Sequence, residues 1–303
     1  MAQSERVLCA VDFSDQSRRA LDFAVAMARW HGAQVTALYV HQLTVPALAA
    51  APFMAPELIQ PARLTDAERA HLNQALTSFV APDRAAGTSV ETLVEEDFDV
   101  ARTIVDRAAE LGASALVLGT HGRSGLQRWL LGSTAEKVLR LAACPVVTVP
   151  PRAADAVPAT EASLRRILCP IDYSDSSQRA LDRAVALARE AKARLTIAHV
   201  VELLPEVPDM PMPDASVYRA ARMEDGQRRL SSACAGVQAA VDVDARLLTG
   251  SPHREIVKLA QEQSADLIVM GIHGRGAIDR FLLGSTAQHV TRHAACPVMT
   301  IRS

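Results

Sequence analysis

The sequence predicts an α/β protein built from two tandem, doubly wound (Rossmann-like) modules, each a five-stranded parallel sheet with helices on both faces. One reason is the length of 303 residues, about twice that of a typical domain, with 49% hydrophobic and 22% charged residues. Such a composition is typical of a folded chain with a sizeable core. The other reason is an internal repeat in which short apolar runs alternate with amphipathic segments, as strands and helices do in parallel sheets.

The repeat covers most of the chain. Arg6–Arg29 aligns with Arg166–Arg189 at an offset of 160, with 16 of 24 positions identical. Gly119–Val149 aligns with Gly271–Ile301 at an offset of 152, with 19 of 31 positions identical. A repeat of this length indicates duplicated domains rather than a solenoid. With the Pro- and Ala-rich stretch between the copies taken as a linker, we predict domains at 1–150 and 164–303 and a linker at 151–163.

The elements follow in the order that a parallel sheet requires. In the first copy, short apolar runs predict strands at 7–11, 35–40, 90–94, 115–118 and 145–149. Ser14 is placed to cap the first helix, and further helices are expected at 64–80, 100–111 and 133–141. The second copy predicts strands at 167–171, 195–200, 243–247, 267–270 and 297–301. Sheets of this kind bind ligands beyond the carboxyl ends of their strands, where strand order reverses.

Composition and charge argue against some classes of function. Lys plus Arg number 32 and Asp plus Glu 34, so the chain has no surplus of cations with which to neutralise a polynucleotide. The longest uncharged stretch, 42–56, is too short for a bilayer crossing, and the first residues contain no apolar leader. Five cysteines form no Cys-x-x-Cys pair, which suits a reducing compartment. We therefore expect a cytoplasmic protein that binds neither nucleic acid nor membrane.

The loop after the fourth strand has the same spacing in both copies, Gly-x-x-Gly-x9-Gly-Ser-Thr. Glycine lets the backbone approach an oxyanion closely, and the last glycine falls where a helix begins. The N–H groups and positive dipole end of that helix, with two hydroxyls beside them, would form a phosphate site. The spacing is neither that of a Walker A loop nor that of a G-x-G-x-x-G motif. The residues are Gly119, Gly122, Gly132, Ser133 and Thr134, and in the second copy Gly271, Gly274, Gly284, Ser285 and Thr286.

A purely structural interpretation of these loops fits the sequence about equally well. Ser133-x-x-Glu136 and Ser285-x-x-Gln288 match capping boxes, which stabilise a helix without any ligand. Glycines after a strand are also ordinary turn residues.

A carboxylate follows the first strand in each copy. Asp12 and Asp172 stand where an acid can accept hydrogen bonds from ribose hydroxyls, as in other doubly wound nucleotide sites. Helix capping is again the alternative, because Asp and Ser precede the first helix in both copies. The joint presence of both features in both copies favours a nucleotide site.

Together these features resemble the universal stress protein family of the UspA type, over nearly the whole length of both copies. The shared motifs are Asp-x-Ser, Gly-x-x-Gly-x9-Gly-[Ser/Thr] and a closing Cys-Pro-Val strand. The resemblance implies ATP as ligand, with Asp12 and Asp172 facing the ribose and adenine region. It implies that Val40 and Val200 hold adenine through backbone contacts and that the glycine loops wrap the phosphates. Mg²⁺ would come with the nucleotide, held mostly by phosphates and water.

Two further expectations concern the loops. Arg123 and Arg275 lie within them and would add charge toward the phosphates, although each is equally consistent with a solvated surface residue. The second copy keeps the Gly-x-Pro expected after the third strand, whereas the first has Glu95-Glu96-Asp97-Phe98. Acids there would disfavour a polyphosphate if they faced it, but the usual strand order places the third strand away from the phosphate loop.

The resemblance also implies how the copies associate. The closing strands of the two modules are expected at sheet edges, where apolar strands need cover. We expect them to pair antiparallel, which makes a pseudo-dimer within one chain and leaves a homodimer open.

Functions of different class follow. The leading hypothesis is a stress-response protein that binds ATP and acts as a sensor or regulator. The alternatives are a slow ATP hydrolase and an interaction module that needs no nucleotide. We assign no catalytic residue, because lone histidines such as His121 and His273 are more often loop hydrogen-bonding residues than general bases. No Cys/His cluster indicates a metal site made by the protein, and at most weak ATPase activity is expected.

Overall fold

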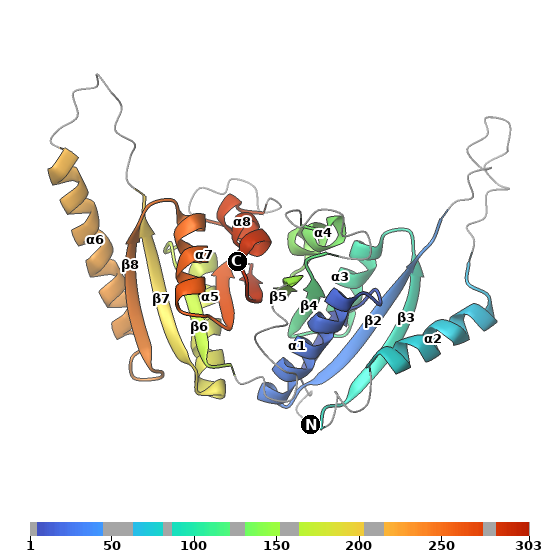
Figure 1. Ribbon diagram of the computed structural model, residues 1–303. Helices are drawn as coiled ribbons and strands as arrows, with labels where there is room; N and C mark the ends of the chain where they lie inside the picture. Colours follow the sequence, from blue (N-terminus) through green and yellow to red (C-terminus); the bar gives the residue numbers. More distant parts are fainter. Residues whose placement is uncertain are drawn as a thin grey trace, which may run out of the picture.

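A computed structural model of the chain describes residues 5–44, 63–80, 87–121, 131–151, 164–202, 215–274 and 283–302. Within them the chain forms two α/β modules (Figure 1). The first contains β1 (Arg6–Ala10), α1 (Asp15–His31), β2 (Gln34–Gln42), α2 (Asp66–Val80), β3 (Val90–Asp97), α3 (Val100–Glu110), β4 (Ala115–Gly119), α4 (Ser133–Leu141) and β5 (Val146–Val149). The second contains β6 (Arg166–Pro170), α5 (Asp175–Ala191), β7 (Arg194–Val201), α6 (Ala215–Ala235), β8 (Val243–Thr249), α7 (Pro252–Glu262), β9 (Leu267–Gly271), α8 (Ser285–His293) and β10 (Val298–Ile301).

The strands of both modules form one 10-stranded sheet in the order β3-β2-β1-β4-β5-β10-β9-β6-β7-β8. Neighbouring strands are parallel within each module, and β5 and β10 pair antiparallel across the junction, with Val147 opposite Met299. The predicted fold class and the predicted antiparallel pairing are therefore confirmed. The two five-stranded halves cover each other's closing edge.

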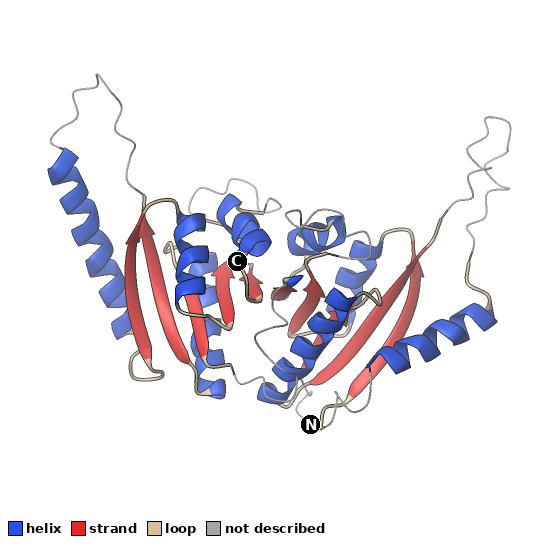
Figure 2. Cartoon of the chain, in the orientation of Figure 1, coloured by secondary structure: helices blue, strands red, loops and turns tan. Residues whose placement is uncertain are grey.

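Helices lie on both faces of the sheet (Figure 2). Residues along β1 alternate between the faces, since Val7 and Cys9 pack in the core that contains α1 and α2, and Leu8 packs in the core that contains α3 and α4. The first of these cores continues into the second module, because it includes Val147 of β5 and Met299 of β10 together with residues of α5 and α6. Residues of α7 and α8 bury a separate cluster on the other face.

The helix starts follow local side-chain chemistry. Ser14 caps α1 as predicted, with its Oγ accepting a hydrogen bond from the Ser17 N–H at 3.2 Å. Helix α2 begins at Asp66 rather than at 64, because Thr65 and Glu68 form a capping box in which the Thr65 N–H donates to Glu68 at 2.8 Å. β3 extends to Asp97, three residues beyond its predicted end.

Side chains also cross the junction between the modules. The guanidinium of Arg302 donates to the Leu139 carbonyl at the end of α4 (3.3 Å). Glu136 of α4 and Arg292 of α8 form an ion pair at 3.7 Å. The junction is therefore polar at its rim and apolar along the paired strands.

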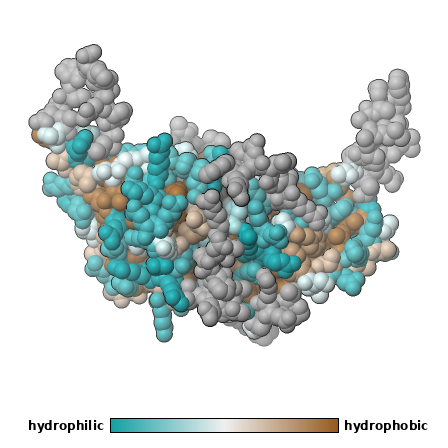
Figure 3. Space-filling model, viewed as in Figure 1, coloured by the Kyte–Doolittle hydropathy of each residue, from teal (hydrophilic) through white to brown (hydrophobic). Residues whose placement is uncertain are grey.

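Hydrophilic side chains cover much of the second module on the face seen in Figure 3, with apolar residues in smaller areas between them. Across the part of the chain that the structure describes, every helix is too short or too polar to traverse a lipid bilayer.

Candidate functional site

A cavity of about 560 Å³ lies in the second module at the carboxyl ends of β6, β7 and β9. β6 and β9 are adjacent. β7 and β8 follow on the far side of β6, and β10 lies on the far side of β9. Parallel sheets bind ligands at such a reversal of strand order. The cavity is lined by seven of the residues singled out from the sequence: Asp172, Val200, Gly271, Gly274, Gly284, Ser285 and Thr286. The remaining candidate of this copy, Arg275, lies outside the described residues.

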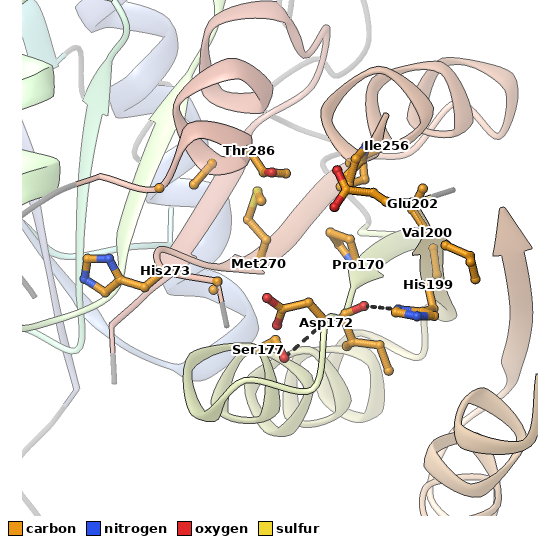
Figure 4. A pocket seen from close by; sticks show the side chains of 18 of the residues that line it. Pro170, Asp172, Ser177, His199, Val200, Glu202, Ile256, Met270, His273 and Thr286 are labelled. Carbon is orange, nitrogen blue, oxygen red and sulfur yellow. Dashed lines mark hydrogen bonds between the residues drawn. The ribbon is translucent and has the colours of Figure 1, made fainter. Parts of the chain in front are cut away.

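Asp172 reaches the cavity from the turn after β6. Its Oδ1 accepts hydrogen bonds from the Ser174 N–H (3.0 Å) and the Ser174 hydroxyl (2.5 Å), while Ser174 itself caps α5. The acid thus orients the capping serine and does not cap the helix directly. Its other oxygen, Oδ2, lies beside Gly274, where an added Cβ would come within 3.0 Å of it. Figure 4 shows Asp172 and Thr286 facing the same space from opposite sides.

An aromatic pair, Tyr173 and His199, lies beside Asp172, and His199 lines the cavity. Tyr173 has a left-handed backbone (φ 66°), and its ring lies 4.7 Å from that of His199. The guanidinium of Arg229 from α6 lies over the Tyr173 ring, 3.9 Å from its centre. A ring nitrogen of His199 is bonded to the Ile171 carbonyl at 2.8 Å (Figure 4). These contacts hold His199 and Arg229 in place, and both residues line the cavity.

The N-terminal turn of α8 forms the opposite wall. Its N-cap is Gly284, which supplies no side-chain bond, and Ser285 and Thr286 are the first helical residues. The capping-box interpretation is therefore wrong for this helix, and equally for α4, where Gly132 is the N-cap without a side-chain bond. The first N–H groups of an α-helix have no acceptor within the helix. This turn presents backbone donors and two hydroxyls to the cavity.

The loop glycines have packing roles that need no ligand. A Cβ at Gly271 would lie 2.5 Å from the Ser176 hydroxyl and 2.8 Å from backbone atoms of α5. A Cβ at Gly284 would lie 2.8 Å from the Ile272 carbonyl, to which the Gly284 N–H donates at 3.0 Å. Glycine is thus required at both positions by close approach of the chain to itself.

Some cavity residues were not singled out from the sequence. Arg222, Asp225, Gly226 and Arg229 come from α6, whereas Pro252 of α7, which also lines the cavity, belongs to the Gly-x-Pro that the sequence analysis noted after the third strand. Only tertiary packing brings α6 to this place. One signal was present, because Gly226 is an isolated glycine in a helical segment, and a Cβ there would lie 3.0 Å from the Val201 side chain.

The first module repeats the arrangement at the ends of β1, β2 and β4. Asp12 Oδ1 accepts from the Ser14 N–H (3.1 Å) and hydroxyl (2.5 Å), and Val40 at the end of β2 is buried. Gly132 donates its N–H to the Thr120 carbonyl at 2.8 Å and precedes Ser133 and Thr134 on α4, while Gly119 ends β4. Gly122 and Arg123 lie outside the described residues.

The acids that distinguish the first module have local partners. Glu95 is paired with Arg107 of α3, and Glu96 with Arg69 of α2. Asp97 Oδ1 accepts from the Asp99 N–H at 3.0 Å. β3 lies at the outer edge of the sheet, with β2 and β1 between it and β4. As expected from the strand order, these acids lie away from the loop that follows β4.

Groups suited to catalysis are less evident than groups suited to binding. The His273 ring points away from Asp172 and Thr286 (Figure 4). Burial raises the pKa of Cys296 to about 12, so its thiol does not ionise near neutrality. Among the described residues, no group of three or more His, Cys, Asp or Glu side chains is arranged to hold a metal ion.

The fold is that of a tandem α/β protein, with a cavity at the reversal of strand order in the second module. The sequence model of the Universal stress protein family matches the chain twice, at residues 3–150 and 163–302. A universal stress protein of Mycolicibacterium smegmatis is 31% identical over 301 residues, which are 98% of this chain and 96% of that protein. The chain belongs to the universal stress protein family and contains two Usp domains.

Solved structures show the same fold. A universal stress protein from Archaeoglobus fulgidus is similar with a TM-score of 0.66 at 23% identity, over 99% of each chain. A functionally unknown protein from Pseudomonas aeruginosa is similar with a TM-score of 0.65 at 18% identity, over 99% of this chain and 92% of that one. At these identities the similarity concerns the architecture alone.

Proposed function

We propose that the second module binds an adenine nucleotide, ATP with Mg²⁺, and that the protein is a cytoplasmic stress-response sensor or regulator that acts through this bound state. The supporting observation is the convergence of an acid, a strand end and a helix N-terminus on one cavity of about 560 Å³. The first turn of α8 suits phosphates. Asp172, across the cavity, suits ribose hydroxyls, because a carboxylate accepts hydrogen bonds but repels phosphate.

We place the phosphates, the ribose and the adenine of the ligand one after another along the cavity. The phosphates would lie against Gly274, Ser285 and Thr286, with Arg275 adding charge. The ribose would lie at Asp172, and adenine would contact the backbone at Val200. The first module would bind in the same way through Asp12, Val40 and the turn at Gly132. A homodimer of whole chains is compatible with this arrangement and is not needed for it.

Calorimetric titration of the full chain with Mg-ATP tests the proposal. The variant Ser285→Ala/Thr286→Ala keeps the Gly284 turn and removes two hydroxyls from the cavity, whereas Ser133→Ala/Thr134→Ala makes the same change in the first module. Hydrogen bonds to a charged group are worth about 1.5–3 kcal/mol each, so affinity at the altered module should fall at least about tenfold. Unchanged titrations of both variants would contradict the proposed phosphate position.

Two measurements distinguish nucleotide binding from slow hydrolysis and from a nucleotide-independent role. Single-turnover measurement with [γ-³²P]ATP separates binding from slow hydrolysis. If the wild-type chain neither retains nucleotide on purification nor binds Mg-ATP, the protein is a nucleotide-independent interaction module.

A further inference from the structure

Three histidines that the proposed nucleotide site does not use lie stacked between α7 and α8. The ring centres of His253 and His289 are 4.1 Å apart, and those of His289 and His293 are 4.0 Å apart with planes inclined by 19°. His253 is in the first turn of α7, and the other two are one turn apart on α8. The first turns of the same two helices line the cavity, through Pro252 and Thr286.

The surroundings of the central ring disfavour a positive charge. Burial, followed by the charges of His293, His253, Arg254 and Arg292, lowers the pKa of His289 to about 4. Arg254 belongs to α7, and Arg292 belongs to α8. From α4, Glu136 faces this region and is paired with Arg292 at 3.7 Å. A proton on His289 would therefore be placed among four cationic or ionisable groups.

The outer rings are held by hydrogen bonds. A ring nitrogen of His293 is bonded to the His289 carbonyl at 2.9 Å, and one of His253 to the Ser251 hydroxyl at 3.1 Å. The rings of His289 and His293 lie face to face, and the His253 ring is tilted by 50° to that of His289. The described residues offer no group of such side chains arranged around a metal ion.

Where the second module has the three histidines, the first module has an ion pair between its corresponding helices. An offset of 152 aligns Ser251, His253, His289 and His293 with Asp99, Ala101, Lys137 and Leu141. Lys137 Nζ lies 2.5 Å from Asp99 Oδ2 and joins α4 to the N-cap of α3. The hydrogen bond from Lys137 lowers the pKa of Asp99, so this pair stays charged in mild acid. The flanking arginines are present in both modules, since Arg254 and Arg292 align with Arg102 and Arg140.

We propose that the His253–His289–His293 stack is an acid-sensitive latch, which holds α7 against α8 while the His289 imidazole is neutral and releases the two helices when His289 is protonated. In the released state the rings separate into water, where His289 returns to its ordinary pKa of 6.5. Because that pKa is lower in the latched state, protons bind the released state more tightly. The released population therefore rises as the pH falls from 6.5 toward 4.

Release would separate the first turns of α7 and α8, which line the cavity. Mild acid would thus loosen the ligand site of the second module and leave that of the first unchanged. The latch does not depend on which ligand fills the cavity, so its test needs no nucleotide.

Hydrogen exchange of the full chain at pH 7.0 and 5.5, corrected for intrinsic rates, is the test. A shift of the His289 pKa between 6.5 and about 4 changes the opening equilibrium by up to about eightfold between these pH values. We expect amide protection in α7 and α8 to fall by up to that factor, while α3 and α4 change less than twofold. Equal loss in both helix pairs, or no loss in α7 and α8, would overturn the latch.

Two variants assign the effect to the stack. His289→Gln removes the titrating ring and should give α7 and α8 the same protection at both pH values. The combined Ser251→Asp, His253→Ala, His289→Lys and His293→Leu variant copies the first module's link and should be equally insensitive to acid. If His289→Gln loses protection in acid as the wild type does, the latch is not at these histidines.

Discussion

At the scale of single residues, the carboxylate of Asp172 contacts two different parts of the second module. Asp172 holds the capping Ser174 through Oδ1 and borders the cavity through Oδ2. Tyr173, between Asp172 and Ser174, has a backbone φ of 66°, and Phe13, between Asp12 and Ser14 in the first module, has φ 64°. A left-handed backbone costs a non-glycine residue of order 1–3 kcal/mol, so its recurrence marks a turn held by surrounding contacts.

Asp172→Ala in the full chain should weaken adenine nucleotides more than inorganic triphosphate, because the carboxylate accepts from ribose and would only repel phosphate. The change also disturbs the cap, so Ser174→Ala is the matched control, with an expected stability cost of about 0.5–2 kcal/mol. Calorimetry with both ligands measures the difference, and the same comparison applies to Asp12→Ala. Equal loss for both ligands would remove the ribose role.

Gly271→Ala and Gly119→Ala form a matched pair at the ends of β9 and β4. The added Cβ would meet α5 at 2.5–2.8 Å in the first case, and the nearest atoms lie at 3.2–3.5 Å in the second. Overpacking costs about 1–3 kcal/mol, so Gly271→Ala should lower the free energy of urea unfolding by that amount and Gly119→Ala by clearly less. Equal costs would show that the clash at Gly271 is relieved by small shifts.

At the scale of elements, helix starts show what the sequence could and could not predict. Ser14 was predicted as a cap because a polar residue precedes an apolar stripe, and the structure agrees. Ser133 and Ser285 have the same local pattern, yet each is the first helical residue after a capping glycine. The difference arises from contacts with distant carbonyls, those of Thr120 and Ile272, which local pattern does not encode. The position of α6 beside the cavity depends likewise on tertiary packing.

Docking of α2 on β3 depends on one nearly buried acid. Glu96 has a 6% exposed side chain, pairs with Arg69 and accepts from the Leu64 N–H at 2.9 Å. Arg69→Ala should destabilise the chain by about 1–3 kcal/mol, because it leaves part of a buried carboxylate unsatisfied. Arg228→Ala removes exposed pairs on α6 and should cost less than about 1 kcal/mol. Similar urea midpoints for the two variants would contradict this account.

At the scale of the whole molecule, the duplicated sequence predicted two sheets with complementary edges, and the structure joins them into one. That step was predicted by the family resemblance, and it agrees with the need of each apolar closing strand for cover. The polar rim was not predicted, because the contacts of Arg302 and the Glu136–Arg292 ion pair are not repeated by symmetry. The residues that align with Glu136 and Arg292 in the other module are Gln288 and Arg140, which cannot form an ion pair. Strand order predicted that the residues at the strand ends would meet at one cavity. It did not predict that α6 would form one side of that cavity.

The shared sheet and the core that continues from Val147 to Met299 predict one cooperative unfolding transition for both modules near neutral pH. Differential scanning calorimetry should give a van't Hoff enthalpy close to the calorimetric enthalpy of the full chain. Two resolved transitions at pH 7 would show that the junction does not couple the modules.

We propose that the cavity between Asp172 and the first turn of α8 is an adenine-nucleotide site. The most direct measurement is a crystal structure of the full chain with Mg-ATP. We expect phosphates at Ser285 and Thr286, ribose hydroxyls within hydrogen-bonding distance of Asp172, and adenine against the backbone at Val200. Nucleotide density at another place, or a cavity without nucleotide at saturating Mg-ATP, would contradict it.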